Sequence, residues 1–481
     1  MNIRLIASGL LAAAALTAQA EVTFPSVVSD NMVLQQQTDA RIWGKAKPGS
    51  IVKVVTSWDG KKSPYKTSAD RDGRWQVKLN TPAATAEPQT ITVTDPDGSK
   101  TLSNVLIGEV WYCSGQSNME MPVRGFHRQP VDGSLDVILE ADSLRPIRMF
   151  TVKKNVSATP LDDCEGQWDL NNPEGVANCS AAGYFFADHL NKQLNVPVGL
   201  VIADWGGTRV QPWMSRESIE PLGLVDTSHL NGTVDMKTKG VHGMASVMYN
   251  AMVAPIVPYS FKGMLWYQGE SNSSDPELYD KLMPVFVTDM RKKFDRGDIP
   301  FYYVQIAPYA GYGGKEKVGV PKLRLVQARL MKQVPNAGMV VTMDIGTEHN
   351  IHPTNKKEVG KRLAYWALAK DYGKNNYAWS GPVYNHMEVE GDKAYLYFDN
   401  TGGGVCPLEE WLDGFEVAGE DGVYYPAEAK VEGPRGLLGV RSDKVAVPKK
   451  VRYGFRTYFE GTLFDNFGLP ASPFITSGEL E

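Results

Sequence analysis

Short runs of alternating apolar and polar residues, separated by turn residues, fill the first part of the chain. Val52–Val55 and Thr90–Thr94 have the pattern of half-buried strands. Asp-Gly pairs, which favour tight turns, stand at positions 59–60, 72–73 and 97–98. This spacing is typical of a small all-β sandwich, and we expect one over residues 21–104.

From about Val105, short apolar runs alternate with helical patterns. The predicted strands are Val110–Tyr112, Ile147–Val152, Gly199–Ala203, Met264–Tyr267, Tyr302–Ile306 and Met339–Thr342. Apolar residues at helical spacing predict helices over 323–334 and 359–366. Strands that are apolar on both faces and alternate with helices predict an α/β domain with a parallel sheet, over residues 105–376. Ligands of such sheets bind at the carboxyl ends of the strands.

Beyond about Tyr377 the pattern changes back to strands. Ala394–Phe398 and Lys450–Phe455 are predicted strands, and Gly402–Gly404 is a flexible turn. We therefore expect a C-terminal β-rich region over residues 377–481.

The first twenty residues have the pattern of a secretory signal peptide. Arg4 supplies a positive start, Leu5–Leu16 is a short apolar run, and Ala18-Gln19-Ala20 has the form of a cleavage site. We expect cleavage near Ala20 and export to the periplasm or the medium, with a retained membrane anchor as the alternative. No later apolar run is long enough to cross a bilayer, so we expect no membrane insertion of the mature chain.

Composition narrows the class of function. The 481 residues are 42% hydrophobic and 22% charged, which allows large cores, and the net charge of -5 does not suggest a nucleic-acid binder. The 11 Trp and 21 Tyr suit sugar-binding clefts and aromatic cores alike. Cys164 and Cys179 are close enough in sequence to form a disulfide, although four unpaired thiols are an equal alternative. No zinc spacing or nucleotide motif occurs, so we expect no metal and no cofactor.

A candidate nucleophile follows the predicted strand Val110–Tyr112. Ser117 stands in Gly115-Gln116-Ser117-Asn118-Met119, where a parallel sheet presents such a residue and where a helix begins. Helix N-cap serines are common, and this is the alternative role.

A serine nucleophile requires a base, and the chain has seven histidines. His352 follows the strand Met339–Thr342 after a loop and precedes a predicted helix. It is therefore expected at the same sheet edge as Ser117, and His349 is the rival candidate.

Two further loops end strands at this edge. Gly206 and Gly207 allow close approach of main-chain N–H groups, and Gln268 and Asn272 carry side-chain amides. These four residues are candidates for an oxyanion hole, the group of donors that stabilises a negatively charged oxygen. We expect Glu270 to brace its loop near the site, and it is also a candidate substrate-binding residue.

These stretches resemble the sialate O-acetylesterase family of the SGNH hydrolase superfamily. The matching segments are residues 108–119, 205–208, 266–272 and 351–353, together with 29–35 and 468–474 near the two ends. The resemblance implies an exported enzyme with a flavodoxin-like hydrolase core, with Ser117 as nucleophile and His352 as base. It also implies an oxyanion hole of the Ser117 N–H, a glycine N–H from Gly206 or Gly207, and an amide from Gln268 or Asn272.

One position departs from the superfamily pattern. An Asp usually stands three residues before the histidine and orients its ring, but this chain has His349 there. Glu348 and Asp344 are candidate orienting acids, and a main-chain carbonyl such as that of Asn350 is the alternative. We favour the carbonyl and hence a Ser–His dyad.

These features favour a carbohydrate O-acetylesterase that acts through an acetyl-serine intermediate. Sialic acid esters are the family's namesake substrate, and acetylated plant polysaccharides such as xylan are the alternative. Arg209 is a candidate partner of a sialate carboxylate, or else a structural residue. A non-catalytic carbohydrate-binding protein would not need both Ser117 and His352, and the acidic residues Glu109 and Glu270 suggest a glycosidase only weakly. The sequence does not indicate an oligomeric state.

Overall fold

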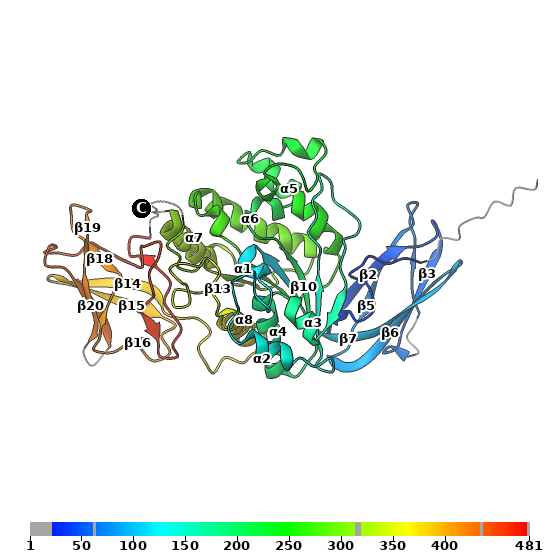
Figure 1. Cartoon of the computed structure of the whole chain (residues 1–481), viewed down its shortest axis with the longest axis horizontal. Coiled ribbons are helices and arrows are strands. Elements are labelled where there is room, and N and C mark those ends of the chain that lie inside the picture. Colours follow the sequence, from blue (N-terminus) through cyan, green and yellow to red (C-terminus); the bar gives the residue numbers. More distant parts are fainter. Residues whose placement is uncertain (1–21, 61–63, 313–318, 433–435, 479–481) are drawn as a thin grey trace, which may run out of the picture.

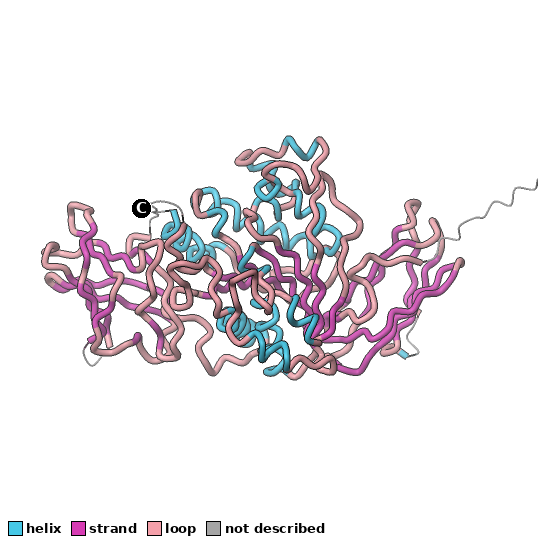
Figure 2. The backbone as a smooth tube through the Cα atoms, in the orientation of Figure 1, coloured by secondary structure: helices cyan, strands magenta, loops and turns pink. Residues whose placement is uncertain are grey.

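The computed structural model describes residues 22–60, 64–312, 319–432 and 436–478. Three regions follow one another along the long axis of the molecule (Figure 1). Strands dominate both ends, whereas the long helices lie in the middle (Figure 2). The long strand β7 (Gly98–Gly115) belongs to the N-terminal region and to the central one.

The central sheet has the strand order β13-β12-β11-β7-β10-β8-β9, and only β9 is antiparallel to its neighbour. Its strands besides β7 are β8 (Ile147–Thr151), β9 (Trp168–Leu170), β10 (Val198–Asp204), β11 (Gly263–Tyr267), β12 (Phe301–Val304) and β13 (Ala337–Val340). The path β10-β7-β11-β12-β13 follows the flavodoxin-like order, with β8 and β9 added beyond β10. The predicted fold class is therefore confirmed.

Long helices cover both faces of this sheet. The helices α4 (Ala181–Leu194) and α8 (Lys356–Asp371) pack on one face, and α6 (Pro276–Phe294) and α7 (Gly319–Gln333) pack on the other. The short helices are α1 (Ser117–Glu120), α2 (Ser134–Leu139), α3 (Pro173–Asn178) and α5 (Arg216–Ile219). Because both faces are buried, β10 and β11 are apolar along their whole length apart from Asp204.

Short one-turn helices recur along the segment between β10 and α6, which also contains α5 and β11. They are η2 (Gln211–Trp213), η3 (Glu220–Leu222), η4 (Ser228–Asn231), η5 (Val241–Gly243), the π-helical η6 (Tyr249–Val253), η7 (Ala254–Ile256) and η8 (Glu270–Asn272).

The N-terminal region consists of two small sheets. Its strands are β1 (Val33–Gln35), β2 (Asp39–Lys45), β3 (Ile51–Thr56), β4 (Tyr65–Ser68), β5 (Arg74–Asn80) and β6 (Thr85–Asp95). β2 pairs with β5, whereas β4, β3 and β6 join β7 in one continuous sheet. The expected boundary between residues 104 and 105 lies inside β7, and the division of the chain into domains stays a prediction.

The C-terminal region is built of antiparallel strands. A five-stranded sheet contains β14 (Val383–Glu390), β15 (Lys393–Asp399), β21 (Leu437–Arg441), β20 (Glu428–Glu432) and β17 (Trp411–Leu412). A four-stranded sheet contains β19 (Tyr424–Pro426), β18 (Phe415–Ala418), β22 (Lys450–Tyr453) and β24 (Phe474–Ile475), and β16 (Val405–Cys406) pairs with β23 (Phe464–Asp465). The two larger sheets share one apolar core, as expected for a β-rich unit.

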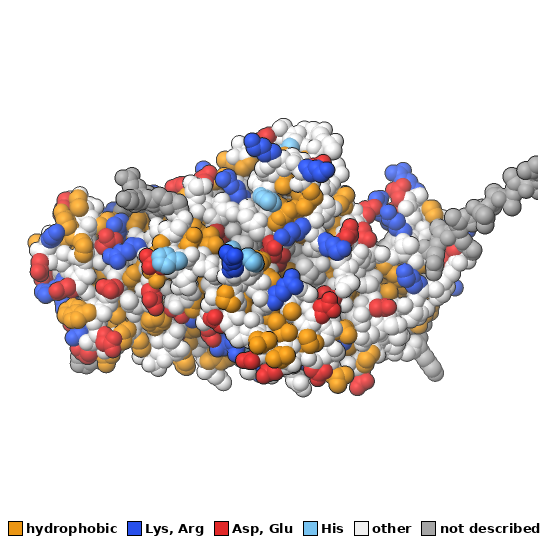
Figure 3. Space-filling model, in the orientation of Figure 1, with side chains coloured by type: hydrophobic (Ala, Val, Ile, Leu, Met, Phe, Trp, Pro, Cys, Tyr) orange, Lys and Arg blue, Asp and Glu red, His pale blue; other side chains and the backbone are white. Residues whose placement is uncertain are grey.

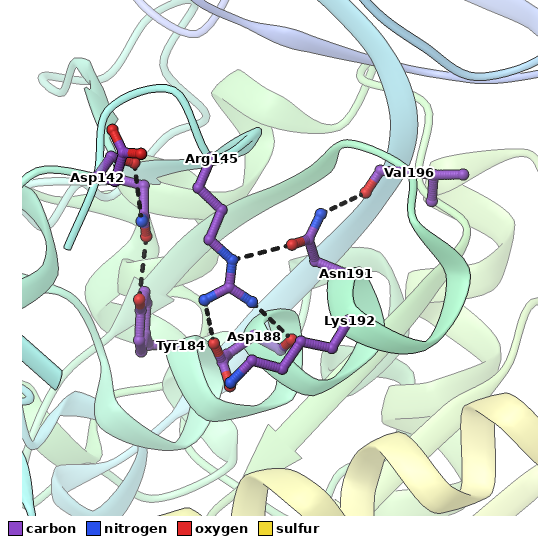
Figure 4. Close-up of polar contacts among 8 residues, drawn as sticks. Asp142, Arg145, Tyr184, Asp188, Asn191, Lys192 and Val196 are labelled. Atoms are coloured by element: carbon purple, nitrogen blue, oxygen red, sulfur yellow. Dashed lines mark hydrogen bonds and ion pairs between the residues drawn. The ribbon is translucent and has the colours of Figure 1, made fainter. Parts of the chain in front are cut away.

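A polar cluster fixes the segment before β8 to helix α4 (Figure 4). The Arg145 guanidinium donates to Asn191 Oδ1 at 3.0 Å and to the main-chain oxygen of Asp188 at 3.1 Å, and it forms an ion pair with the Asp188 carboxylate. Asn191 Nδ2 in turn donates to the Val196 carbonyl at 2.8 Å. The cluster therefore holds the end of α4 beside both β8 and β10.

The structure also bears on two predictions from the sequence, a disulfide and the absence of membrane-spanning segments. All four cysteines are free thiols, so the Cys164–Cys179 disulfide that the sequence left open is not formed. Within the described ranges, none of the helices has the length and apolar character needed to span a membrane. The predicted signal peptide lies outside the described residues.

Arg324 on α7 joins the central region to the C-terminal region. Its side chain is fully buried and donates to four main-chain carbonyls, those of Ile306, Ala307, Arg456 and Thr457, at 2.8–3.1 Å. Burial lowers the pKa of Arg324 to about 10, so the guanidinium stays charged at neutral pH. These carbonyls satisfy the buried charge, and removing it takes one donor away from each of them.

We expect Arg324→Met to lower the free energy of unfolding by about 3 kcal/mol or more, because buried carbonyl acceptors lose a hydrogen-bond donor. The melting temperature, measured by circular dichroism, should fall by several degrees. Arg329→Met is the matched control, because Arg329 lies on the same helix, is one-third exposed and pairs with Asp280 at 3.2 Å. A surface pair contributes little, so equal shifts in the two variants would contradict the role of Arg324.

Candidate active site

The end of β7 is shaped by Gly115. Its φ of 149° is one that glycine adopts readily, and a Cβ there would stand 2.2 Å from the Tyr267 carbonyl oxygen on β11. The next residue, Gln116, donates its main-chain N–H to the same oxygen at 3.0 Å. This close approach turns the chain sharply and places Ser117 at the first position of α1.

The short helix α1 is anchored by its neighbours. Ser180, the N-cap of α4, donates its hydroxyl to the Met119 carbonyl, and the Ala181 N–H donates to the Met121 carbonyl at 2.8 Å. Gln116 Oε1 accepts the N–H groups that follow β11 at 3.2–3.3 Å. Ser117 therefore stands on a rigid support despite the shortness of its helix.

The structure brings Ser117 and His352 together. The distance from Ser117 Oγ to His352 Nε2 is 2.8 Å, and both residues are half-buried. The His352 N–H donates to Asn350 Oδ1 at 3.0 Å, and the ring of Phe126 packs edge-on against the imidazole at 5.3 Å. A serine and a neutral imidazole in this arrangement can form a nucleophile and its base.

The second ring nitrogen of His352 has a partner that the sequence analysis did not consider. Nδ1 lies 2.6 Å from Oε1 of Gln129, a residue in the loop between α1 and α2. An amide oxygen only accepts, so Nδ1 carries the proton and Nε2 is left free to accept the proton of Ser117. The expectation of a main-chain carbonyl is therefore wrong, and the orienting group is a neutral side-chain carbonyl.

Both candidate orienting acids have other partners. The Asp344 carboxylate forms two hydrogen bonds with the Arg362 guanidinium at 2.8 and 2.6 Å. Glu348 points to the surface, where it lies 3.7 Å from His349, whose side chain is 89% exposed. The loop before His352 thus directs its acids away from the imidazole, which corrects the predictions for Glu348 and Asp344 and leaves His349 outside the site.

A row of buried polar groups lies beside the serine. Lys356 on α8 is 0% exposed, and its Nζ donates to Asn118 Oδ1 at 2.6 Å and lies 5.5 Å from the Tyr267 ring centre. The Asn118 amide donates to the Glu270 carboxylate on its other side and to the Ile351 carbonyl at 3.1 Å. The predicted bracing role of Glu270 agrees with this contact.

These buried charges affect the titration of the site. Burial lowers the pKa of Lys356 to about 7 and raises the pKa of Glu270. Burial, and next the nearby Lys356 charge, lower the pKa of His352 to about 4, although Glu120 acts in the opposite direction. The imidazole is therefore neutral, and able to accept a proton, through the whole neutral range.

The two glycines after β10 have different environments. The Gly206 N–H donates to the Glu120 carboxylate, and a Cβ on Gly206 would stand 3.2 Å from that of Ser117. Gly207 adopts a φ of 74°, and its N–H has no partner in the described part of the chain. Of the two predicted donors, only Gly207 has an N–H that is open to a substrate.

The predicted amide donors are buried in a network. Gln268 Nε2 donates to Asn272 Oδ1 at 2.8 Å and to the Thr208 carbonyl at 3.2 Å. Asn272 donates in turn to Gln211 Oε1 at 3.2 Å and accepts from the Val210 N–H at 3.0 Å. The two amides thus brace the loops after β10 and β11 against each other, which differs from the predicted role in an oxyanion hole.

Arg209 is exposed, and its main-chain N–H donates to the His242 carbonyl at 3.2 Å. Its side chain forms no ion pair within the described residues. In the same part of the chain, no three His, Cys, Asp or Glu side chains group as metal ligands.

Comparison with known proteins gives a consistent result. Residues 107–369 match the family described as "Carbohydrate esterase, sialic acid-specific acetylesterase". The chain is 30% identical over 406 residues to the sialate O-acetylesterase of Pongo abelii and 29% to that of Homo sapiens, covering 78% of this chain and 75% of each relative. A carbohydrate acetylesterase from Xanthomonas citri is 32% identical, with a TM-score of 0.84 over 95% of this chain and 99% of its own.

We expect Gln129→Ala to lower kcat for hydrolysis of p-nitrophenyl acetate by about 10- to 100-fold, because the ring loses its orienting acceptor but no charge is removed. Gln129→Glu should retain activity and move the acid limb of the pH profile upward by at least about one pH unit, because a carboxylate favours the imidazolium. Glu348→Gln is the control and should behave as the wild type. A larger loss in the control than in Gln129→Ala would contradict this assignment.

The pH dependence of the wild type provides a second test. Because only neutral imidazole accepts the serine proton, kcat/KM should fall as the pH drops through the lowered pKa of His352, about 4. An ordinary histidine would place this limb near pH 6.5. The profile should be measured with p-nitrophenyl acetate, and circular dichroism should confirm the fold at each pH. A limb near pH 6.5 in folded protein would contradict the lowered pKa of His352.

Proposed function

The chain belongs to the family of sialic acid-specific acetylesterases, which are carbohydrate esterases, and from this we propose that it removes O-acetyl groups from sialic acid. In this proposal Ser117 is the nucleophile and His352 is the general base. The matched segment, residues 107–369, contains both side chains.

One observation carries the proposal: the 2.8 Å contact between Ser117 Oγ and His352 Nε2, with Nδ1 held by Gln129. It supports a nucleophile whose proton has an acceptor in place before the substrate arrives. Because Gln129 is neutral, this is a Ser–His dyad assisted by an amide.

The reaction follows from these positions. Ser117 Oγ attacks the acetyl carbonyl carbon while its proton passes to His352 Nε2, and the tetrahedral intermediate then expels the sugar oxygen, which takes the proton from His352. Water attacks the acetyl-serine in the second half, again losing a proton to His352. Acetate leaves, and Ser117 regains its hydroxyl proton.

The negative charge of the intermediate develops on the acetyl oxygen. The main-chain N–H groups of Ser117 and Gly207 are the proposed oxyanion donors, because one opens helix α1 and the other has no competing acceptor. The Gly206 N–H remains hydrogen-bonded to the Glu120 carboxylate. Gln268 and Asn272 hold the loops after β10 and β11 in place.

The cellular location of the protein and its division into domains are part of the same proposal. The pattern of residues 1–20 supports export with cleavage near Ala20. The segments 21–104, 105–376 and 377–481 would then form the mature enzyme, with the central one holding every residue assigned to the reaction.

We expect the purified protein to release acetate from O-acetylated sialic acid faster than from acetyl-xylan, and Ser117→Ala to lower kcat by at least about a thousandfold. Acetate release should be followed enzymatically with both substrates and with p-nitrophenyl acetate. Residual activity near the wild-type level in Ser117→Ala would refute the nucleophile.

Ser114→Ala is the matched control, because Ser114 lies three residues earlier inside β7 and is fully buried. It should keep most of the activity. If acetyl-xylan were the preferred substrate, the esterase assignment would stand, and the sialic acid assignment would fall.

A further inference from the structure

A pocket of about 530 Å³ opens beside the catalytic pair. Its walls come from the loop after α1, from the segment after β8 and from the end of β10. Two wall residues connect it to the site, because Glu120 accepts the Gly206 N–H and Phe126 packs on the His352 ring. The pocket therefore adjoins the two residues that contact the glycine loop and the imidazole.

Basic side chains surround this pocket. Figure 3 shows Lys and Arg side chains, with a few acidic ones between them, near the middle of the face over α1 and the end of β10. The cations that line the pocket are Arg124, Lys153 and Lys154. Lys153 pairs with Glu165 at 3.0 Å, and Lys154 pairs with Glu120 at 2.6 Å.

Arg124 differs from the two lysines. Its main-chain N–H donates to the Ala177 carbonyl at 3.1 Å, which fixes the backbone of its loop. Its guanidinium forms no hydrogen bond or ion pair within the described ranges. Because the other two cations are neutralised, Arg124 supplies one uncompensated positive charge to the pocket.

A buried acid completes the wall. Asp204 at the end of β10 is 6% exposed, lines the pocket and has no side-chain hydrogen bond to another described residue. Burial, and next the nearby Glu120, raise the pKa of Asp204 to about 8. At neutral pH this carboxyl is mostly protonated, so it adds little negative charge and presents a hydroxyl donor to a ligand.

We propose that this pocket is the subsite for an acidic sugar, in which the Arg124 guanidinium binds the sugar carboxylate and Asp204 contacts a sugar hydroxyl. A guanidinium can hold a carboxylate through two parallel hydrogen bonds, which orients the sugar as well as binding it. The proposal rests on the proposed function, because it names the group of sialic acid that the enzyme recognises. It also replaces Arg209, which does not line this pocket.

The test compares O-acetylated sialic acid with its methyl ester, in which a methyl group removes the negative charge of the carboxylate. The wild type should have a kcat/KM at least about tenfold higher for the free acid. Arg124→Gln should lower kcat/KM for the free acid about 10- to 100-fold, mainly through KM, and should leave the methyl ester and p-nitrophenyl acetate unchanged. The unchanged reactions also show that the variant is folded.

Lys153→Gln is the matched control, because it removes one positive charge from the same rim where Glu165 already neutralises it. It should change the ratio of the two substrates by less than about twofold. Equal kcat/KM for acid and ester in the wild type, or a loss with Arg209→Gln instead of Arg124→Gln, would overturn the subsite. Activity on acetyl-xylan without activity on either sialic acid substrate would instead overturn the proposed function.

Discussion

The hydrogen bond between Ser117 Oγ and His352 Nε2 joins residues 235 positions apart, and its length of 2.8 Å leaves little freedom for either backbone. Ser117 follows β7, in the middle of a parallel sheet, and His352 follows β13 at its edge. The carboxyl ends of parallel strands all lie at the same end of the sheet, so the fold brings the two residues to that end. The loops, and not the sheet, then span the distance that remains between the ends of β7 and β13. Gly115 draws the serine toward β11, and the long loop after β13 carries the histidine inward.

Neutrality of His352 is the second condition, and the surroundings of the dyad maintain it. A carboxylate beside Nδ1 would raise the pKa of the imidazole, whereas Gln129 fixes the tautomer without adding charge. Lys356 adds a buried positive charge nearby. The Asn118 side chain accepts from Lys356 and donates to the Glu270 carboxylate, so it links the two charged groups. Each of these buried charges is costly alone, but the row satisfies them together. The same row holds Asn118, the residue after the proposed nucleophile, so the electrostatics and the position of Ser117 depend on one set of contacts.

The sequence predicts the sheet and the dyad because both depend on local patterns. Apolar runs mark β10 and β11, and Ser117 and His352 stand where their strands end. Gln129 gave no such signal, because it lies in an irregular loop 223 residues before its partner. The signal at Lys356 was misleading, since a lysine just before a predicted helix is normally exposed. Both contacts are set by the way distant loops fold over the sheet edge, which neither periodicity nor spacing describes.

Glu120 connects the loop beside Ser117 with the pocket proposed to bind the sugar. One oxygen of its carboxylate holds the Gly206 N–H, next to the glycine whose N–H stays open, and the other pairs with Lys154 in the pocket wall. Lys154 also lies 5.8 Å from the Trp205 ring centre, at the start of the same glycine loop. The position of the loop therefore depends on the charge of the pocket. Because Glu120 neutralises Lys154, it also leaves Arg124 as the cation that a ligand meets unpaired. A single carboxylate thus fixes the loop beside Ser117 and determines which cation of the pocket remains available.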